Sequence, residues 1–283
     1  MNRVALITGS SGTLGGLLAK SLIERGYSLI LLSRNSKDII KLKINHKIQF
    51  LYYYSLDALN EKMYSKLTKF LKKNNINKID LLINNLGAQQ PIGNFFDTNI
   101  DDWINNINVN FLSHVRLIHT LKDFLLAGKN SLILNISGGG ATSPRLNFSA
   151  YSCAKTALVR FSENLALELL DYKIRINAIA PGQINSKMMD EIICSGKSNA
   201  GEKEILEAHK IKQNNLDNLT KVIDLIFFLD SERGQSINGK LISAQWDNWS
   251  VWSTNENFLM SNDLYTLRRI VGRDRNFIDG DIS

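Results

Sequence analysis

The residues of this 283-residue chain best suited to proton transfer are a tyrosine and a lysine four positions apart, Tyr151 and Lys155. At this spacing two side chains lie one turn apart on the same face of a helix. The apolar residues that follow keep helical spacing at positions 157, 158, 161, 165 and 169. A phenol has a pKa of about 10, and a fixed ammonium beside it favours the ionised form. The pair could act as general acid and base, although a half-buried tyrosine beside a solvated lysine has the same spacing.

The elements that must position this pair alternate along the chain. Short apolar runs bounded by turn residues predict strands at 3–8, 28–33, 48–54, 79–84, 131–136, 174–180 and 240–244. Longer stretches of helical periodicity predict helices at 13–25, 60–74, 101–126, 151–171 and 217–230. Such alternation is typical of βαβ units. We therefore expect an α/β fold, a doubly wound parallel sheet of about seven strands with helices on both faces.

A glycine-rich turn joins the first predicted strand to the first predicted helix. There the backbone can approach a pyrophosphate, which then lies at the positive end of the helix. The candidate residues are Gly9, Ser11, Gly12, Thr13, Leu14 and Gly15. The second strand ends in Ser33 and Arg34 and lacks the carboxylate that usually binds the ribose of NAD, so Arg34 favours NADP(H) over NAD(H). The alternative interpretations are a tight turn without a ligand and an exposed turn arginine.

Further candidate residues follow the ends of the later strands. In an open α/β sheet the carboxyl ends of the strands border the crevice that binds ligands. The candidates are Asp57 and Ala58 after the third strand, Asn85 and Gly87 after the fourth, Ser137 after the fifth, and Pro181 and Gly182 after the sixth.

Composition limits the classes of function. The net charge of +7 comes largely from scattered lysines, which indicate solvated faces rather than a nucleic-acid-binding patch. No apolar run reaches membrane-spanning length, and the N-terminus enters a strand pattern without the features of a signal peptide. Cys153 and Cys194 are too few for a disulfide framework or a zinc site. We expect a cytoplasmic protein that binds neither nucleic acid nor membrane and holds no metal.

Taken together, these motifs resemble the short-chain dehydrogenase/reductase family over roughly residues 3–245. The glycine-rich turn, Asn-Asn-x-Gly, Asn, Ser, Tyr-x-x-x-Lys and Pro-Gly occur in the family's order and at family-like separations. The resemblance implies a one-domain, three-layer Rossmann fold of the family's main branch. It also implies hydride transfer between a nicotinamide cofactor and a carbonyl or alcohol. The family's members commonly form homodimers or homotetramers through helices like 101–126 and 151–171.

The resemblance implies a role for each catalytic candidate. Tyr151 would be the general acid in reduction and the base in oxidation. Lys155 would hold the nicotinamide ribose and lower the pKa of Tyr151. Ser137 would bind the substrate oxygen, and Asn110 would position a water in a proton relay behind Lys155.

Cofactor contacts are implied by the same resemblance. Asp57 would contact the adenine, and Asn85 and Ile184 the cofactor further along. Ser186 stands where the family has a threonine near the carboxamide. The glycine turn departs from the main branch because Thr13 replaces its middle glycine, whereas Gly12 gives the spacing of the extended branch. In addition, a leucine at position 86 replaces the family's alanine, which alters only packing.

The catalytic serine is a second departure. In the family it usually lies thirteen residues before the tyrosine, and this position is Gly138 here. Ser137 lies one residue earlier. Either the loop carries an extra residue and Ser137 serves, or the serine is absent. Ser143 and Ser149 are fallback hydroxyls.

Two segments lie outside the motif set. Residues 183–216 resemble the family's substrate lid, with a flexible stretch at 195–201, or form a surface insertion. We expect residues 1–245 to form the dinucleotide-binding and catalytic domain. Residues 246–283 would be an extension whose Trp246, Trp249 and Trp252 pack on the domain, the substrate mouth or a neighbouring subunit. Arg268 and Arg269 could bind a phosphate-bearing substrate or face water.

The leading hypothesis is therefore a ketoreductase-type, NADP-preferring enzyme. An acyl-carrier or fatty-acyl ketone and a nucleotide-linked or phosphorylated sugar are the two substrate classes considered. The alternative is a non-catalytic NADP-binding sensor or scaffold, which Gly138 and the altered glycine turn would favour. The combined presence of Tyr151, Lys155 and Asn110 argues for the enzyme, because a binding module needs no proton relay.

Overall fold

The sheet has the predicted topology. The computed structural model describes residues 3–34, 48–213 and 217–276. Within them seven parallel strands form one sheet in the order β3-β2-β1-β4-β5-β6-β7. The strands are β1 (Val4–Thr8), β2 (Ser28–Ser33), β3 (Leu51–Ser55), β4 (Leu81–Asn84), β5 (Leu132–Ile136), β6 (Arg175–Ala180) and β7 (Leu241–Ser243). The predicted doubly wound α/β fold is confirmed.

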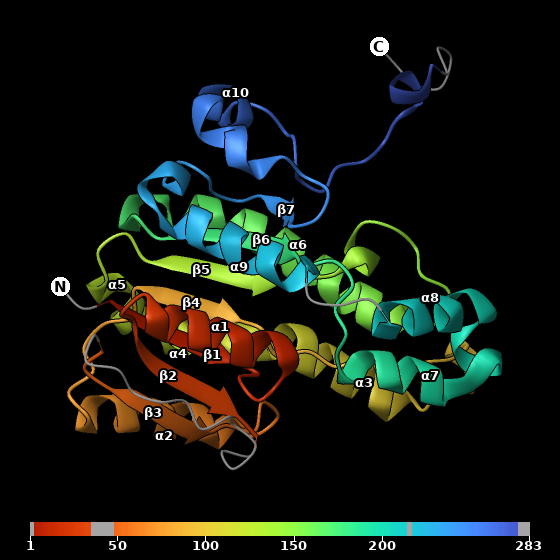
Figure 1. Cartoon of the computed structure of the whole chain (residues 1–283), viewed down its shortest axis with the longest axis horizontal. Helices are drawn as coiled ribbons and strands as arrows, with labels where there is room; N and C mark the ends of the chain where they lie inside the picture. The colour runs from red at the N-terminus through yellow and green to blue at the C-terminus, as the bar shows by residue number, and fades with distance from the viewer. Residues whose placement is uncertain (1–2, 35–47, 214–216, 277–283) are drawn as a thin grey trace.

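Helices cover both faces of this sheet (Figure 1). They are α1 (Thr13–Glu24), α2 (Glu61–Lys73), α3 (Ile100–Ile107), α4 (Ser113–Thr120), α5 (Lys122–Ala127), α6 (Ser149–Glu168), α7 (Lys187–Ala200), α8 (Glu202–Gln213), α9 (Asp217–Asp230) and α10 (Glu256–Met260). Helices α1 and α9 pack on one face, and α2, α4, α5 and α6 pack on the other. None of the helices in the described ranges is both long enough and apolar enough to cross a bilayer.

Alternation along each strand divides the core into two halves. In β1, Ala5 and Ile7 join the cluster beneath α1 and α9, while Val4 and Leu6 join the cluster beneath α2 and α6. Successive side chains of a strand point to opposite faces, and a parallel sheet covered on both faces therefore needs continuous apolar strands. This requirement explains why the strands read as short apolar runs in the sequence.

The helix expected at 101–126 is three helices. A π-helical turn, Asn108–Leu112, separates α3 from α4, and Leu121 separates α4 from α5. A π-turn inserts an extra residue into the helical repeat and is frequent at functional sites. Hydrophobic periodicity over the whole stretch does not reveal such a local insertion.

The stretch at 195–201, expected to be flexible, is largely helical. It forms the end of α7, which kinks at Gly196, and α8 follows directly. Apolar residues of both helices, including Met189 and Ile205, are buried in one cluster with Ile92 and Phe148. Tertiary packing therefore overrides the polar composition of this stretch. Residues 214–216 of the predicted lid lie outside the described residues.

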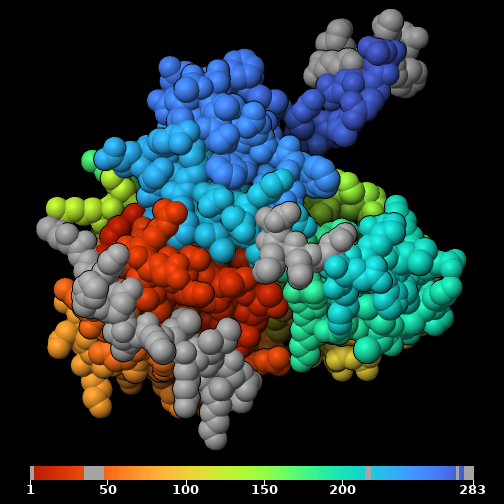
Figure 2. Space-filling view, in the orientation of Figure 1, coloured from red at the N-terminus to blue at the C-terminus, as the bar shows by residue number. Residues whose placement is uncertain are grey.

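The residues that directly follow β7 pack on their own chain and on the cluster that contains α9, whereas the last described residues, dark blue in Figure 2, project away from the body of the molecule. Trp252 is buried in the core cluster and stacks on Tyr265 at 4.3 Å between ring centroids. Trp249 lies 5.4 Å from the ring of Phe228 in α9, whereas Trp246 is 87% exposed. Residues 277–283 of the predicted extension lie outside the described residues.

The same segment covers the edge of the sheet at β7. The amide of Leu241 donates to the carbonyl of Tyr265 at 2.8 Å, and Lys240 Nζ donates to the carbonyls of Asn262 and Leu264. Unpaired strand edges invite association with other chains, so this cover protects the fold. Arg268, one of the two candidate phosphate ligands, pairs instead with Asp263 and Asp274 of the segment itself. Arg269 is exposed.

We predict that Trp252→Ala lowers the free energy of unfolding by about 3 kcal/mol or more, because it removes a buried aromatic side chain. Trp246→Ala is the matched control, and we expect it to change stability by less than about 0.5 kcal/mol, since that side chain faces solvent. Urea unfolding followed by circular dichroism measures both. Equal effects of the two substitutions would contradict the packing of this segment on the core.

Candidate active site

The structure brings Tyr151 and Lys155 together on the buried face of α6. Both side chains are buried, and Lys155 Nζ lies 5.7 Å from the centroid of the Tyr151 ring. Lys155 Nζ donates a hydrogen bond to the carbonyl of Ile136, the last residue of β5, at 2.8 Å. This bond fixes the ammonium at the carboxyl edge of the sheet, one helical turn from the phenol.

Burial dominates the electrostatics of the pair. It lowers the pKa of Lys155 to about 7. It raises the pKa of Tyr151, and the positive charge of Arg145 partly opposes this effect. The family resemblance implies that Lys155 lowers the pKa of the phenol. In this structure the largest influence on that pKa is burial, which raises it. Burial, and then the charge of Lys155, lower the pKa of His114 to about 3, so this imidazole is neutral.

Gly138 is the residue of the loop after β5 that faces the phenol. A Cβ atom built on Gly138 would lie 2.5 Å from Tyr151 Oη and 3.4 Å from its Cζ. The backbone of Gly138 is extended, with φ −172°, which any residue can adopt. A side chain at position 138 would therefore require the phenol to shift, although the backbone itself would accept any residue. In this chain the phenol oxygen takes the space of a side chain at position 138.

Ser137 forms no hydrogen bond with the phenol. Its Oγ is buried and has no hydrogen-bond partner among the described residues, the phenol included. The expectation that Ser137 pairs with Tyr151 is thus not met by the structure, and the loop shift that it requires is absent because position 138 itself abuts the phenol. Ser149 Oγ accepts a hydrogen bond from Trp103 Nε1 at 3.0 Å, and Ser143 is exposed.

Asn110 holds the loop after β4 from within the π-turn. Its Nδ2 donates to the carbonyl of Ala88 at 2.8 Å, and its Oδ1 accepts from the amide of Ala88 at 3.1 Å. A Cβ atom built on Gly87 would lie 3.2 Å from this Oδ1, 3.2 Å from Met188 Cε and 3.7 Å from Lys155 Nζ. Gly87 is therefore the point where Asn110, Lys155 and the helix α7 converge.

The glycine turn forms a cradle suited to a phosphate. Gly9 has φ +62°, and a Cβ atom on Gly15 would lie 2.4 Å from the carbonyl oxygen of Gly9. Asn85 Nδ2 donates to the carbonyls of Thr8 and Gly9 at 3.1 and 3.2 Å and so fixes the turn. No side chain caps the N-terminus of α1, and its first turn has no acidic residue. An anion can bind at such a helix end, so these residues fit a pyrophosphate.

The remaining candidates border the same edge of the sheet. Thr13, which replaces the family's glycine, begins α1 with its side chain exposed. Arg34 is exposed directly after β2, and its carbonyl accepts from Ser55 Oγ at 2.7 Å. The other candidates follow strand ends or begin helices, namely Ser11, Gly12 and Leu14 around the start of α1, Ser33 at the end of β2, Asp57 and Ala58 after β3, and Pro181, Gly182, Ile184 and Ser186 after β6.

Three residues near the pair were missed by sequence reasoning. His114 follows Asn110 by four residues, so helical spacing could have placed both on one face. Met188 lies within the predicted lid segment, residues 183–216, and had no predicted role of its own. Arg145 gave no local signal, since its partner is Glu204, which lies far along the chain.

Comparisons of this chain with known proteins agree on one protein family. A family model described as short chain dehydrogenase matches residues 3–194. An uncharacterized oxidoreductase of Bacillus subtilis (strain 168), YvaG, is 26% identical over 86% of this chain and 94% of that protein. The benzil reductase ((S)-benzoin forming) of Bacillus cereus is 28% identical over 67% of this chain and 79% of that protein.

The fold agrees with solved structures. A short chain dehydrogenase/reductase from Saccharomyces cerevisiae superposes with a TM-score of 0.75 and 23% identity, over 88% of this chain and 98% of that one. With the family model matching more than half of the chain, this protein belongs to the short-chain dehydrogenase/reductase family of oxidoreductases, whose members bind NAD(P)(H).

Proposed function

We propose that this protein is an NADP(H)-preferring oxidoreductase that interconverts a carbonyl and an alcohol, with Tyr151 as the proton donor and acceptor. The observation that supports this most strongly is the buried Tyr151–Lys155 pair at the carboxyl edge of the sheet. A phenol and an ammonium buried side by side cost desolvation energy that a purely structural site would not need.

Different residues at this edge of the sheet would bind different parts of the cofactor. The glycine turn and the start of α1 would bind the pyrophosphate, and Arg34 would bind a 2′-phosphate on the adenosine ribose. Asp57 and Ala58 would border the adenine, and Asn85, Gly87 and Lys155 would border the nicotinamide riboside. Pro181, Gly182, Ile184 and Ser186 would border the carboxamide. A bound nicotinamide dinucleotide supplies or accepts the hydride.

Proton transfer follows from the state of the phenol. In reduction, Tyr151 Oη donates its proton to the carbonyl oxygen as the hydride reaches the carbonyl carbon. Burial raises the pKa of Tyr151, so the phenol is protonated at neutral pH. This state is the one that reduction requires. Asn110, which fixes the loop before Gln89, acts as a positioning residue and would orient a water behind Lys155.

Because Gly138 has no hydroxyl group, Tyr151 is the one side chain that we assign as a hydrogen-bond donor to the substrate oxygen. We therefore withdraw Ser137 from the catalytic set. The alternative of a non-catalytic binding protein is not favoured, because the chain belongs to a family of oxidoreductases.

We also propose an oligomeric state and a cellular location for this protein. Apolar side chains are exposed on α3 and α6, with Ile104 47% and Leu167 77% exposed. We propose that two copies pair through these helices, because isologous helix pairing would bury both faces. The exposed free thiols of Cys153 and Cys194 fit a reducing, cytoplasmic environment.

We predict that Tyr151→Phe lowers kcat for carbonyl reduction at least about 100-fold, since the proton donor is lost. NADPH binding should be retained. Loss of NADPH absorbance measures turnover, and the exposed Tyr172→Phe serves as the control that should leave kcat unchanged. Unchanged turnover in Tyr151→Phe would reject Tyr151 as the acid, and absence of turnover in every variant and the parent would favour the binding protein.

We predict that Gly138→Ser, which restores the family's serine, lowers kcat/KM about 100-fold rather than raising it. The new Cβ would displace the phenol, and small misplacements of catalytic groups have effects of this size. Gly139→Ser is the matched control, because a Cβ at position 139 would meet no atom within 4 Å. A gain of activity in Gly138→Ser would contradict the proposed position of Tyr151.

We predict that Arg34→Ala raises KM for NADPH at least about tenfold and leaves KM for NADH nearly unchanged. The reason is that a charged hydrogen bond to the 2′-phosphate contributes roughly 1.5 kcal/mol or more. Lys20→Ala, on the exposed face of α1, is the control. Equal effects on both cofactors would show that Arg34 does not select NADP(H).

A further inference from the structure

The loop after β5, residues 138–142, lies against the helix that carries the catalytic pair. At one end of the loop, a Cβ atom on Gly138 would lie only 2.5 Å from Tyr151 Oη. At the other end, Thr156 Oγ1 in α6 donates to the carbonyl of Ala141 at 3.1 Å. The amide of Ala141 donates to the carbonyl of Gly138 at 3.0 Å, so a backbone hydrogen bond joins the two ends. A shift of Ala141 would therefore also move the backbone beside the phenol.

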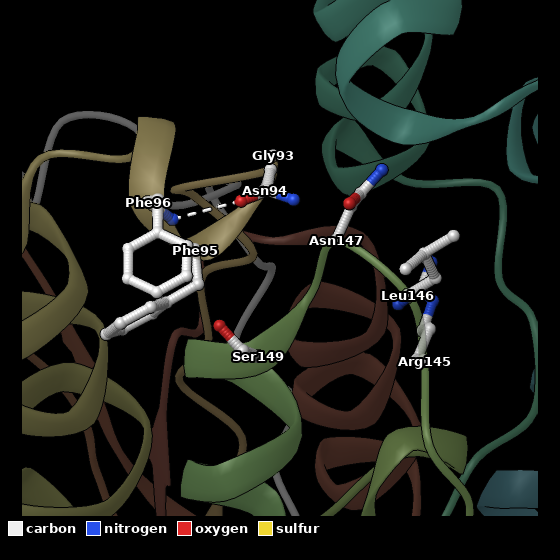
Figure 3. Close-up of a pocket in the computed structure, with 8 residues that line it drawn as sticks. All are labelled: Gly93, Asn94, Phe95, Phe96, Arg145, Leu146, Asn147 and Ser149. Carbon is white, nitrogen blue, oxygen red and sulfur yellow. Dashed lines mark hydrogen bonds between the residues drawn. The ribbon is translucent and has the colours of Figure 1, made fainter.

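The first turn of α6 is incompletely packed on another side. Figure 3 shows a hollow beside Ser149, the first residue of the helix, with two phenylalanine rings at its rim. The volume of the hollow is about 350 Å³, and neither Tyr151 nor Lys155 lines it. An open side loses the packing contacts that would hold a side chain in place. The contacts between this turn and the loop 138–142 are therefore the more important for its position.

A residue of the segment after β7 packs on the same loop. Leu267 lies half-buried against a small core cluster. The members of this cluster are Ala141 of the loop, Val159 of α6 and Ala178 of β6. Val159 is fully buried and lies one helical turn after Lys155. Leu267 thus contacts a cluster to which the loop, the catalytic helix and the sheet all contribute.

The backbone of Leu267 is held by two side chains of α6. Its amide donates to Glu163 Oε1 at 2.6 Å, and its carbonyl accepts from the guanidinium of Arg160. Arg160 and Glu163 also form an ion pair, with Nη1 2.6 Å from Oε2. Glu163 is only 9% exposed, and a carboxylate is rarely buried to this extent unless it is paired and hydrogen-bonded. The pair therefore fixes the place at which Leu267 meets the cluster.

The residues just before Leu267 are anchored to the sheet. The carbonyl of Tyr265 accepts from the amide of Leu241 in β7 at 2.8 Å, and the Tyr265 ring stacks on the buried Trp252. Only beyond this point does the chain leave the body of the molecule (Figure 2). Leu267 is thus held from two sides, by β7 and by α6.

We propose that the segment after β7 positions Tyr151. Leu267, held by the ion pair on α6, supports the loop 138–142 against that helix and so keeps the loop beside the phenol. The inference rests on the proposed carbonyl reduction, and it assigns a part in that reaction to a segment beyond the residues that the family model matches. Leu267 and Glu163 are positioning residues, because they act through Ala141 rather than on the substrate.

Two substitutions remove this support in different ways. Leu267→Ala deletes the side chain that packs on the loop, and Glu163→Ala deletes the acceptor of the Leu267 amide. With NADPH and acetophenone, we expect each to lower kcat at least about tenfold, since small displacements of a catalytic group have effects of this size or larger. KM for NADPH should change less than about twofold, because the glycine turn precedes α1 whereas Leu267 packs on α6.

Matched variants separate this role from a general loss of packing. Leu267→Met keeps the size of the side chain and should retain the parent kcat. Leu264→Ala removes the same type of side chain from an exposed position three residues earlier in the segment. Glu256→Ala removes an exposed carboxylate at the start of α10. Both control variants should also retain the parent kcat.

Amide hydrogen exchange gives a readout that needs no turnover. We expect the amide of Ala141, which donates to Gly138, to exchange at least about tenfold faster in Leu267→Ala and Glu163→Ala than in the parent, because the loop opens locally more often. The amides of β1 should keep their exchange rates. Leu267→Met, Leu264→Ala and Glu256→Ala should leave the loop as protected as in the parent.

The outcomes distinguish the support of the loop from the proposed function. Unchanged loop exchange and unchanged kcat in both disruptive variants would reject the support and leave the function intact. A parent protein that reduces no ketone would reject the function, and loop exchange would still decide the support. Faster loop exchange with unchanged kcat would show that the segment holds the loop without positioning Tyr151, which overturns the proposal. Equal acceleration in β1 would overturn it too, since the segment would then stabilise the fold as a whole.

Discussion

The contact between the Tyr151 phenol and the backbone of Gly138 is the constraint on which the active site depends. A Cβ atom at position 138 would lie only 2.5 Å from the phenol oxygen. Because that backbone is extended and unstrained, the glycine has no conformational reason to be there. With glycine at position 138, the phenol can lie close to the backbone that follows β5. In the proposed mechanism, acid–base chemistry at this site relies on Tyr151 and on the buried Lys155.

The environment of the buried Tyr151 phenol also depends on the helices that follow β6. Helices α7 and α8 lie beyond the carboxyl ends of the strands (Figure 1) and bury an apolar cluster on Ile92 and Phe148. Arg145 joins α8 to the loop before α6 through Glu204, and its charge is the one that opposes the raised pKa of Tyr151. The pKa of the phenol therefore depends in part on the packing of α8 against the loop before α6. Met188 of α7 lies against Gly87 beside Lys155, so α7 also contacts the surroundings of the lysine.

Sequence patterns predicted what depends on local periodicity and on short motifs. Alternating apolar runs gave the parallel sheet, and helical spacing placed Tyr151 and Lys155 on one face of α6. The patterns failed where tertiary packing decides. The ends of α7 and the course of α8 depend on burial against Ile92, and the π-turn at Asn110 depends on bonds to Ala88. Spacing identified Gly138 as the serine position, but only coordinates show that the phenol fills the space beside it.

The central claim is that this site transfers a hydride to a carbonyl while Tyr151 supplies the proton. Its most direct test is to incubate the protein with acetophenone and NADPH that carries deuterium at both C4 positions of the nicotinamide, and to analyse the product by mass spectrometry. The account predicts an alcohol with one deuterium on the carbinol carbon. Bound NADPH with no alcohol formed, from acetophenone or from any ketone of a wider panel, would contradict it. So would an alcohol that lacks deuterium.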